Sequence, residues 1–279
     1  MKKLVKFLFI AVTAILLFVF IEDMQDSGYQ PRYNYGYNNI TTTKTSTTYA
    51  TKNSYTKNNA AKTTATKTQT KQVVDTRVPD YQGTETDYRE VKYTWTTHDN
   101  REAYMILNID YNVYKYYGGL DRYYLEQEYP NYVKDAYSKA YAKQVVGALK
   151  DIQIQAGYSD YELVLEAMNF VQSCITYKTD SNGNYPQYII ETLYKGTGDC
   201  EDVSMLMAAI FKEMGYGSVL LLYTDHMAVG IKADKSREGV YYEYAGDAYY
   251  YVEATNTGWG IGQVPKDYEG KSAIVLNVW

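Results

Sequence analysis

The sequence predicts an α+β domain, with N-terminal helices packed on an antiparallel sheet, that follows an apolar N-terminal segment and a polar linker. Three observations predict this organisation. Apolar side chains recur at helical spacing between residues 132 and 214, and β-branched and aromatic runs separated by turn residues follow up to residue 254. Hydrophobic residues make up 46 % of the 279 residues and charged residues 22 %, which is enough apolar surface for a folded core.

The first 26 residues predict a signal anchor with one transmembrane helix. Residues 4–21 form an apolar run interrupted only by Lys6 and Thr13, and its roughly 18 residues are enough to cross a membrane if Lys6 snorkels. Lysines precede the run and acidic residues follow it, which places the N-terminus in the cytoplasm and the remainder outside. The run has no small-residue cleavage site after it, so a single-pass anchor in the cell membrane is favoured. A cleaved signal, which would give a secreted protein, is the alternative.

Residues 27–74 predict a disordered linker. They are rich in Thr, Lys and Asn, and they carry Arg32 and six Lys but no acidic residue. Such a segment has too little aliphatic surface to offset the entropy of ordering it. Because the whole chain has a net charge of −5, the part after the linker is strongly acidic. An acidic body on a basic tether argues against a nucleic-acid partner.

Residues 75–158 predict a β-hairpin with a helical extension. Residues 88–97 and 103–117 are rich in β-branched and aromatic types, and residues 98–101 form the turn between them. Residues 132–156 place apolar side chains at helical spacing and end at Gly157, so they predict one helix. Whether this region is a separate subdomain or extends the sheet stays open.

Residues 159–279 predict the core that carries the chemistry. A second helix follows Ser159, and the strongest apolar stripe runs from Val203 to Met214 and is closed by Gly215. Asp199 is the predicted N-cap of this last helix, so Cys200 stands at its first position. Strands are then predicted at residues 218–223, 226–233, 240–244 and 249–254.

Two cysteines are too few for a disulfide framework, and with only two histidines the chain has no zinc pattern. Cys174 is interpreted as a small buried apolar residue, and a disulfide between Cys174 and Cys200 is the alternative. His98 is interpreted as a residue of the hairpin turn.

Two polar segments resemble ligand loops without matching them. Residues 180–184 are rich in side-chain oxygens, but Tyr185 stands where a calcium loop requires Gly, so an Asx-rich turn is favoured. Residues 258–262 are Gly-rich but lack the strand-to-helix context of a phosphate loop. They predict a loop at the rim of the site, with Trp259 as a candidate for covering the cleft. We expect no metal and no cofactor.

Cys200, His226 and Glu253 are the candidate catalytic residues. A helix N-terminus stabilises a thiolate, whereas three carboxylates beside Cys200 oppose it, so an imidazolium partner is required. His226 opens a strand on which small residues follow on the same face, which leaves room for a helix end. Glu253 ends a Tyr-rich strand and is placed to orient the imidazole.

These motifs resemble a known family. Gly-Asp-Cys-Glu-Asp at 198–202, His-Met-Ala-Val-Gly at 226–230 and Tyr-Val-Glu-Ala-Thr at 251–255 resemble the transglutaminase-like domain of the papain-like cysteine hydrolase superfamily. The resemblance covers roughly residues 160–265, and the chain looks like a microbial, membrane-anchored member. It implies a Cys nucleophile, a His and an acid, carried over to Cys200, His226 and Glu253. The family's acid is more often Asp, so Asp247 is the fallback.

The resemblance implies extracytoplasmic acyl transfer on protein or peptide amides, either as hydrolysis or as cross-linking. The expected partners are a protein or peptide substrate and a membrane bound through residues 4–21; the sequence does not predict an oligomeric state. Two other classes stay open, an inactive binding module whose cleft holds a ligand and a structural surface protein.

Overall fold

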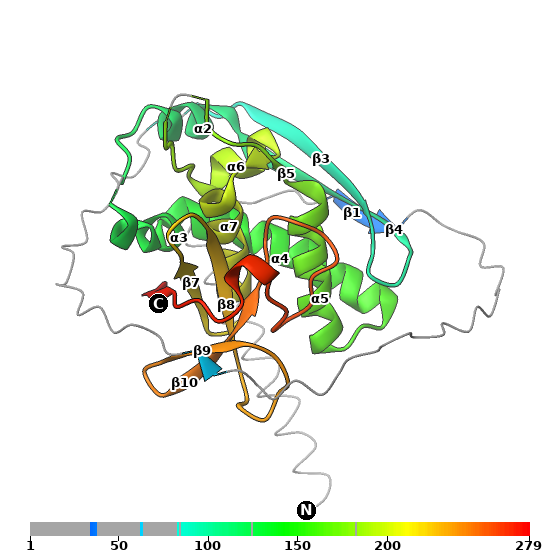
Figure 1. The fold of residues 1–279 in the computed structure, drawn as a ribbon. Coiled ribbons are helices and arrows are strands. Elements are labelled where there is room, and N and C mark those ends of the chain that lie inside the picture. Colours follow the sequence, from blue (N-terminus) through cyan, green and yellow to red (C-terminus); the bar gives the residue numbers. More distant parts are fainter. Residues whose placement is uncertain (1–33, 38–61, 64–82, 84, 124, 182) are drawn as a thin grey trace, which may run out of the picture. The chain divides into compact units, whose positions relative to one another are not determined.

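The computed structural model describes residues 34–37, 62–63, 83, 85–123, 125–181 and 183–279, which are coloured in Figure 1. Residues 34–279 form one compact unit. The predicted anchor at residues 1–26 lies outside the described residues. Among the helices that the structure describes, none combines the length and the hydropathy of a membrane span.

The N-terminal hairpin consists of β3 (Tyr88–Thr96) and β4 (Glu102–Asp110), paired antiparallel with Val91 opposite Leu107. The predicted second strand, 103–117, ends early because Asp110 caps a helix, α2 (Tyr111–Gly118), by accepting a hydrogen bond from the backbone of Asn112 at 2.9 Å. The aromatic run after Asp110 is therefore helical, and its prediction as strand is wrong.

Two short strands lie within the range predicted to be a linker. β1 (Asn34–Tyr37) pairs antiparallel with β4, and β2 (Lys62–Thr63) pairs parallel with β9. Backbone pairing with the folded unit is thus present at these two places. The rest of the linker at 27–74 lies outside the described residues, and its disorder stays a prediction.

The helix predicted at 132–156 is divided in two. A short helix, α3 (Pro130–Lys134), is followed by α4 (Ala136–Ala156), because the carboxylate of Asp135 accepts hydrogen bonds from the backbones of Tyr137 and Ser138 and starts a new helix. Gly157 ends α4 in the left-handed region at φ 73°, as the sequence predicts. α5 (Asp160–Cys174) then starts from Ser159, which forms a reciprocal capping box.

The remaining helices lead to the candidate site. α6 (Ile189–Lys195) is not predicted from the sequence, and two-residue strands β5 (Thr176–Tyr177) and β6 (Thr197–Gly198) pair in parallel on either side of it. α7 (Cys200–Glu213) begins and ends within one residue of the prediction, and its residues from Asp202 to Phe211 are all buried. Two 3₁₀ turns, η1 (Glu126–Glu128) and η2 (Lys266–Tyr268), lie in the connections.

The main sheet has the strand order β11-β7-β8-β10-β9-β2. The predicted strands are confirmed as β7 (Ser218–Leu222), β8 (Met227–Ala233), β9 (Tyr241–Tyr244) and β10 (Asp247–Val252), and all four pair antiparallel with their neighbours among them. The sequence did not predict β11 (Ile274–Asn277), which pairs antiparallel with β7.

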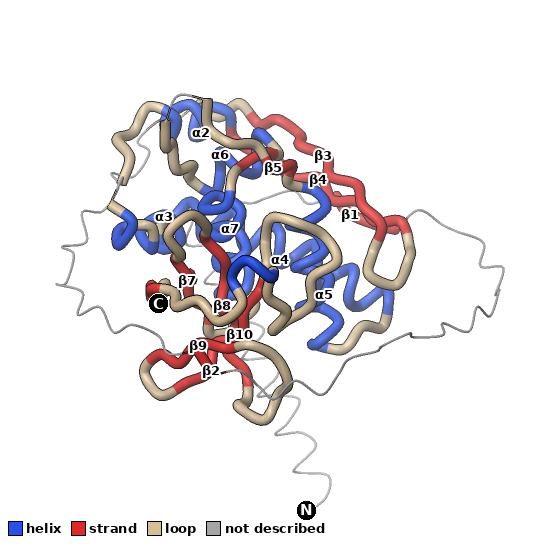
Figure 2. The backbone as a smooth tube through the Cα atoms, viewed as in Figure 1, coloured by secondary structure: helices blue, strands red, loops and turns tan. Residues whose placement is uncertain are grey.

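Helix α7 lies at the centre of this arrangement. It packs against β7 and β8 on one side and against α4 and α5 on the other, and those two helices contact the hairpin (Figure 2). One hydrophobic core includes Trp95 of the hairpin, Leu149 of α4, Phe211 of α7 and Val229 of β8. The hairpin does not extend the main sheet; it belongs to a separate three-stranded sheet across the helices.

Candidate functional site

The first turn of α7 carries Cys200. Cys200 is the first residue of the helix and Asp199 its N-cap, as the sequence predicts. The backbone N–H of Asp199 donates to Oδ2 of Asp202 at 3.4 Å, which closes the turn. Gly198 allows this close approach, since a Cβ at that position would lie 2.6 Å from Cβ of Asp202. Cys200 therefore stands at the unpaired N–H groups and the positive end of the helix dipole.

The Cys200 thiol is half-buried and faces a carboxylate. Its S–H donates to Oε2 of Glu201, the next residue, at 3.2 Å. Burial and then the charge and hydrogen bond of Glu201 raise the pKa of the Cys200 thiol, and the backbone N–H of Met227 opposes this rise. The thiol is thus protonated at neutral pH in this arrangement and needs a proton acceptor before it acts as a nucleophile.

His226 lies beside Glu253 because β8 begins one residue after His226 and its antiparallel partner β10 ends one residue before Glu253. Nε2 of His226 is 3.1 Å from Oε2 of Glu253, whose side chain is 2 % exposed. An ionised carboxylate only accepts hydrogen bonds, so the proton of a neutral imidazole resides on Nε2. Nδ1 is then the proton acceptor of the ring.

Glu253 is held in its ionised form by several donors. Burial alone would raise its pKa, but hydrogen bonds from His226, Thr255 and Tyr251 hold the pKa of Glu253 at about 2. Thr255 donates through its backbone N–H at 2.9 Å and its hydroxyl at 2.6 Å, and the Tyr251 hydroxyl donates at 2.6 Å. The side-chain amide of Gln172, in α5, donates to the Glu253 backbone carbonyl at 2.7 Å.

Aromatic rings fix the plane of the imidazole. Tyr268 stacks on His226 with ring centroids 4.7 Å apart and an interplanar angle of 24°. The ring centroid of Tyr223 lies 4.9 Å from that of Tyr268, and the hydroxyl oxygen of Tyr223 is 2.5 Å from that of Tyr242. Sequence reasoning missed Tyr268, because nothing next to it in the chain distinguishes it from the other 34 tyrosines.

Cys200 and His226 line one cleft of about 360 Å³. The helix is joined to the strand there, since the hydroxyl of Ser204, one turn after Cys200, donates to the carbonyl of Met227 at 2.9 Å. Five acidic side chains line the cleft: Glu126, Asp180, Asp199, Glu201 and Asp225. Burial, followed by the charges of Asp202 and Glu201, raises the pKa of Asp199 to about 9, so Asp199 is protonated at neutral pH and the other four are the carboxylates of the cleft. The cleft thus has a negative electrostatic potential.

Two other predicted site residues lie elsewhere. Asp247, the fallback for the acid, is at the far end of β10, where it pairs with Lys232 at 2.7 Å and lines a different hollow of about 810 Å³. Trp259 is half-buried in the loop after β10 and is not among the residues lining the cleft of Cys200. Of the predicted residues Glu253, Asp247 and Trp259, it is Glu253 that contacts His226.

The remaining cysteine and histidine have structural partners. Both cysteines are free, so the alternative of a Cys174–Cys200 disulfide is wrong. Burial, followed by the charge of Glu166, raises the pKa of the Cys174 thiol to about 12. His98 is more than a turn residue, because its Nδ1 lies 2.7 Å from Oε2 of the fully buried Glu166.

In the oxygen-rich segment the side chain of Asp180 accepts a hydrogen bond from the backbone N–H of Tyr185, and because residue 182 lies outside the described residues, the predicted turn stays a prediction. Glu191, which would be the last ligand of a calcium loop, instead pairs with Arg122 at 2.9 Å. Among the described residues, no group of three or more His, Cys, Asp or Glu side chains is arranged to hold a metal ion.

Comparison with known proteins identifies one family. Residues 147–221 match the family model of the transglutaminase-like superfamily, and no curated protein matches the chain. The matched region runs from the second half of α4 to β7, so it includes Cys200 and ends before His226 and Glu253. It begins within a helix that the sequence assigned to the N-terminal extension. The chain therefore contains a domain of the transglutaminase-like superfamily at residues 147–221.

Proposed function

We propose that this protein is an extracytoplasmic thiol enzyme that transfers acyl groups from protein or peptide amides through Cys200, His226 and Glu253. The observation that carries the proposal is the 3.1 Å contact between His226 and the buried Glu253, in the same cleft as a cysteine at a helix N-terminus. A nucleophile, a base and an orienting carboxylate are the parts that covalent acyl transfer requires.

In the proposed reaction, Nδ1 of His226 accepts the thiol proton and Cys200 Sγ attacks the carbonyl carbon of the amide. The backbone N–H of Cys200, which has no acceptor within the helix, stabilises the oxyanion. The imidazolium then protonates the leaving amine as the C–N bond breaks and a thioester forms. Water gives hydrolysis of the thioester, and a primary amine gives a cross-link, with His226 again taking the proton of the attacking group.

Glu253 has a distinct part in this scheme. With a pKa of about 2 it is ionised at every pH at which the enzyme would work. It therefore keeps the proton of the neutral imidazole on Nε2 and stabilises the imidazolium that forms during the attack. Tyr251 and Thr255 hold the carboxylate, so its position does not depend on His226 alone.

The proposed location rests on residues 4–21, a run long enough to span a membrane. This location is tested by expressing the full chain in cells, isolating their membranes and extracting the membranes at alkaline pH. An integral anchor stays in the membrane pellet, whereas a peripheral or cleaved protein is released. Protease treatment of intact cells then reports on which side the folded unit lies.

One observation favours a second function, that of a binding module without chemistry. The Cys200 thiol is hydrogen-bonded to the Glu201 carboxylate, and this contact raises the pKa of the thiol. If His226 does not take the proton, the cleft holds a ligand but does not cleave it. In that case Cys200→Ala would leave ligand binding unchanged.

Alkylation of the full chain in detergent micelles distinguishes the two functions. The rate at which iodoacetamide modifies Cys200 is followed by mass spectrometry over a range of pH, with Cys174 as the internal reference. An enzyme is expected to show faster alkylation of Cys200 than of Cys174 at neutral pH, and to lose this difference in His226→Ala. Equal alkylation rates of Cys200 in the wild type and in His226→Ala would support the binding module. Incorporation of a fluorescent primary amine into a glutamine-containing protein, compared with the release of new N-termini, then separates cross-linking from hydrolysis.

A further inference from the structure

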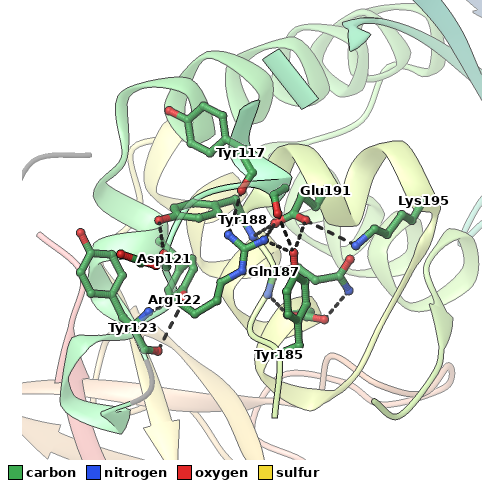
Figure 3. A network of polar contacts seen from close by, with 12 residues as sticks. Tyr117, Asp121, Arg122, Tyr123, Tyr185, Gln187, Tyr188, Glu191 and Lys195 are labelled. Atoms are coloured by element: carbon green, nitrogen blue, oxygen red, sulfur yellow. Dashed lines mark hydrogen bonds and ion pairs between the residues drawn. The ribbon is translucent and has the colours of Figure 1, made fainter. Parts of the chain in front are cut away.

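A buried ion pair joins the segment after α2 to α6. Arg122 and Glu191, whose side chains are 2 % and 1 % exposed, are 2.9 Å apart (Figure 3). Arg122 also donates to the carbonyl of Tyr117 at 2.9 Å. Desolvation offsets most of the attraction within a buried pair, so such a pair adds little net stability. Its contribution here is to hold one local conformation.

Glu191 organises the segment that precedes α6. Its Oε2 accepts a hydrogen bond from the backbone N–H of Tyr188 at 3.0 Å, and its Oε1 accepts one from the Tyr185 hydroxyl at 3.1 Å. The guanidinium of Arg122 lies over both rings, 4.3 Å from the centroid of Tyr185 and 5.0 Å from that of Tyr188. Pro186 and Gln187 lie between these two tyrosines in the chain, so Gln187 is held from both sides.

Gln187 connects this segment to the turn that carries Cys200. Its backbone N–H donates to Oδ1 of Asp202 at 2.7 Å, and its side-chain amide donates to the other oxygen of the same carboxylate. That amide also donates to the carbonyl of Thr197 at 3.1 Å. Asp202 is 2 % exposed and accepts the hydrogen bond of Asp199 that closes the first turn of α7. A chain of direct contacts thus joins Arg122 to the residues on both sides of Cys200.

We propose that Gln187 is a positioning residue for Cys200, held in place by the buried Arg122–Glu191 pair. This inference rests on the proposed function, because it gives Gln187 a part in presenting the thiol to His226. By fixing both oxygens of Asp202, Gln187 sets the first turn of α7 and hence the direction in which Cys200 Sγ leaves the helix. Without these donors, the Asp202 side chain would keep the weaker hydrogen bond from the backbone N–H of Asp199, at 3.4 Å.

The variant Gln187→Met tests this, because methionine has a similar volume but no side-chain donor, so Oδ2 of Asp202 loses the amide while the backbone N–H of residue 187 still donates to Oδ1. We expect kcat to fall roughly 10–100-fold with KM changed less than about threefold, since a displaced nucleophile weakens the transition state more than substrate binding. The alkylation rate of Cys200 should change in the same variant while that of Cys174 does not. Amide hydrogen exchange at the first turn of α7, residues 200–204, should become faster.

Two further variants keep the result interpretable. Lys195→Met removes the exposed partner of Glu191, at 3.4 Å, without touching Gln187, and is expected to leave kcat and Cys200 alkylation unchanged. Gln187→Glu places a second carboxyl group against the buried Asp202 in place of the amide donor, and it is expected to lower kcat at least as far as Gln187→Met does.

The inference is overturned if folded Gln187→Met retains wild-type kcat and wild-type Cys200 alkylation. Failure of the proposed function gives a different result. In that case the alkylation rate of Cys200 is the same in the wild type and in His226→Ala. In that case the hydrogen-exchange and alkylation effects of Gln187→Met still decide whether Gln187 positions the turn.

Discussion

The chain contains two histidine–glutamate pairs, and only one of them lies in a cleft with a thiol. His98 Nδ1 contacts Glu166 at 2.7 Å, and His226 Nε2 contacts Glu253 at 3.1 Å. Both carboxylates are buried, with 0 % and 2 % of their side chains exposed. The distance and burial of a pair of this kind therefore do not identify a catalytic site.

The difference lies in what surrounds each pair. Glu166 also accepts a hydrogen bond from the indole N–H of Trp95 at 2.6 Å, so it fastens the hairpin to α5. The ring centroid of His98 lies 4.6 Å from the ring centroid of Tyr158. By contrast, the ring of His226 borders a cleft that Cys200 also lines. The first pair connects two elements, whereas the second leaves Nδ1 of its imidazole to act on a neighbouring group.

Substitution of the two cysteines tests the difference between the two sites most directly. Cys200→Ala is expected to reduce turnover of a peptide amide to background, a loss of at least about 10³-fold, because no other group forms the thioester. Cys174→Ala removes a thiol that contacts the carbonyl of Thr94 at 3.9 Å, and it should leave turnover within about twofold. Turnover of Cys200→Ala near the wild-type level would exclude covalent catalysis by this residue.

The two histidines should differ in their effect on turnover. His226→Ala is expected to lower turnover roughly 10²–10⁴-fold, as for loss of a general base, and also to lower the free energy of unfolding, because it removes one partner of the buried Glu253. His98→Ala should leave turnover unchanged but reduce the free energy of unfolding by about 1–3 kcal/mol, because it removes a partner of the buried Glu166. Turnover and urea unfolding of both variants provide the measurements, and a loss of turnover in His98→Ala would contradict the division of roles.

The acid stability of the protein should depend on Glu253. Its pKa falls from 4.5 to about 2 in the folded state, so its contribution is present above pH 4.5 and is lost as the pH falls towards 2. A shift of this size corresponds to about 3 kcal/mol. Unfolding free energies measured between pH 6 and 2 should decline less steeply in Glu253→Gln than in the wild type, and equal slopes would show that Glu253 is not held ionised.

The contact between Cys200 and Glu201 predicts a gain of reactivity. Glu201→Gln removes the negative charge that raises the pKa of the thiol, so the thiolate fraction at pH 7 should increase. A pKa lower by about one unit would give a roughly tenfold faster reaction with iodoacetamide. Glu213→Gln, at the other end of α7, is the matched control and should react as the wild type does. A slower reaction in Glu201→Gln would mean that Glu201 assists the thiol.

Local sequence signals predicted the start of α7 and the ends of β8 and β10 well, because each depends on nearby residues. Asp199 and Gly215 delimit the central helix, and the strand periods of β8 and β10 place His226 and Glu253 at adjacent strand ends. For the same reason the domain of the superfamily was recognised from short motifs around Cys200.

What the sequence did not predict depends on contacts between distant residues or on a local competition. The run after Asp110 has the aromatic composition of a strand, but the capping carboxylate starts α2 instead. Asp135 divides α3 from α4 in the same way. Tyr268 contacts His226, which is 42 residues away in the sequence, and Gln187 contacts Asp202, which is 15 residues away. Neither contact can be predicted from a local sequence pattern.

The smallest predicted effect concerns the charge of the cleft compared with the surroundings of Cys174. Besides the protonated Asp199, four carboxylates line the cleft of Cys200, so a cationic thiol reagent should be concentrated there and an anionic one depleted. At low ionic strength we expect Cys200 to react a few-fold faster with a cationic methanethiosulfonate than with an anionic one of similar size. Because the Debye length is about 10 Å at 0.1 M salt and about 3 Å at 1 M, the preference should largely disappear at high salt. Cys174, which is outside this cleft, serves as the reference in the same sample. An equal preference at both cysteines would mean that the net charge of the whole chain, and not the four carboxylates around Cys200, selects the reagent.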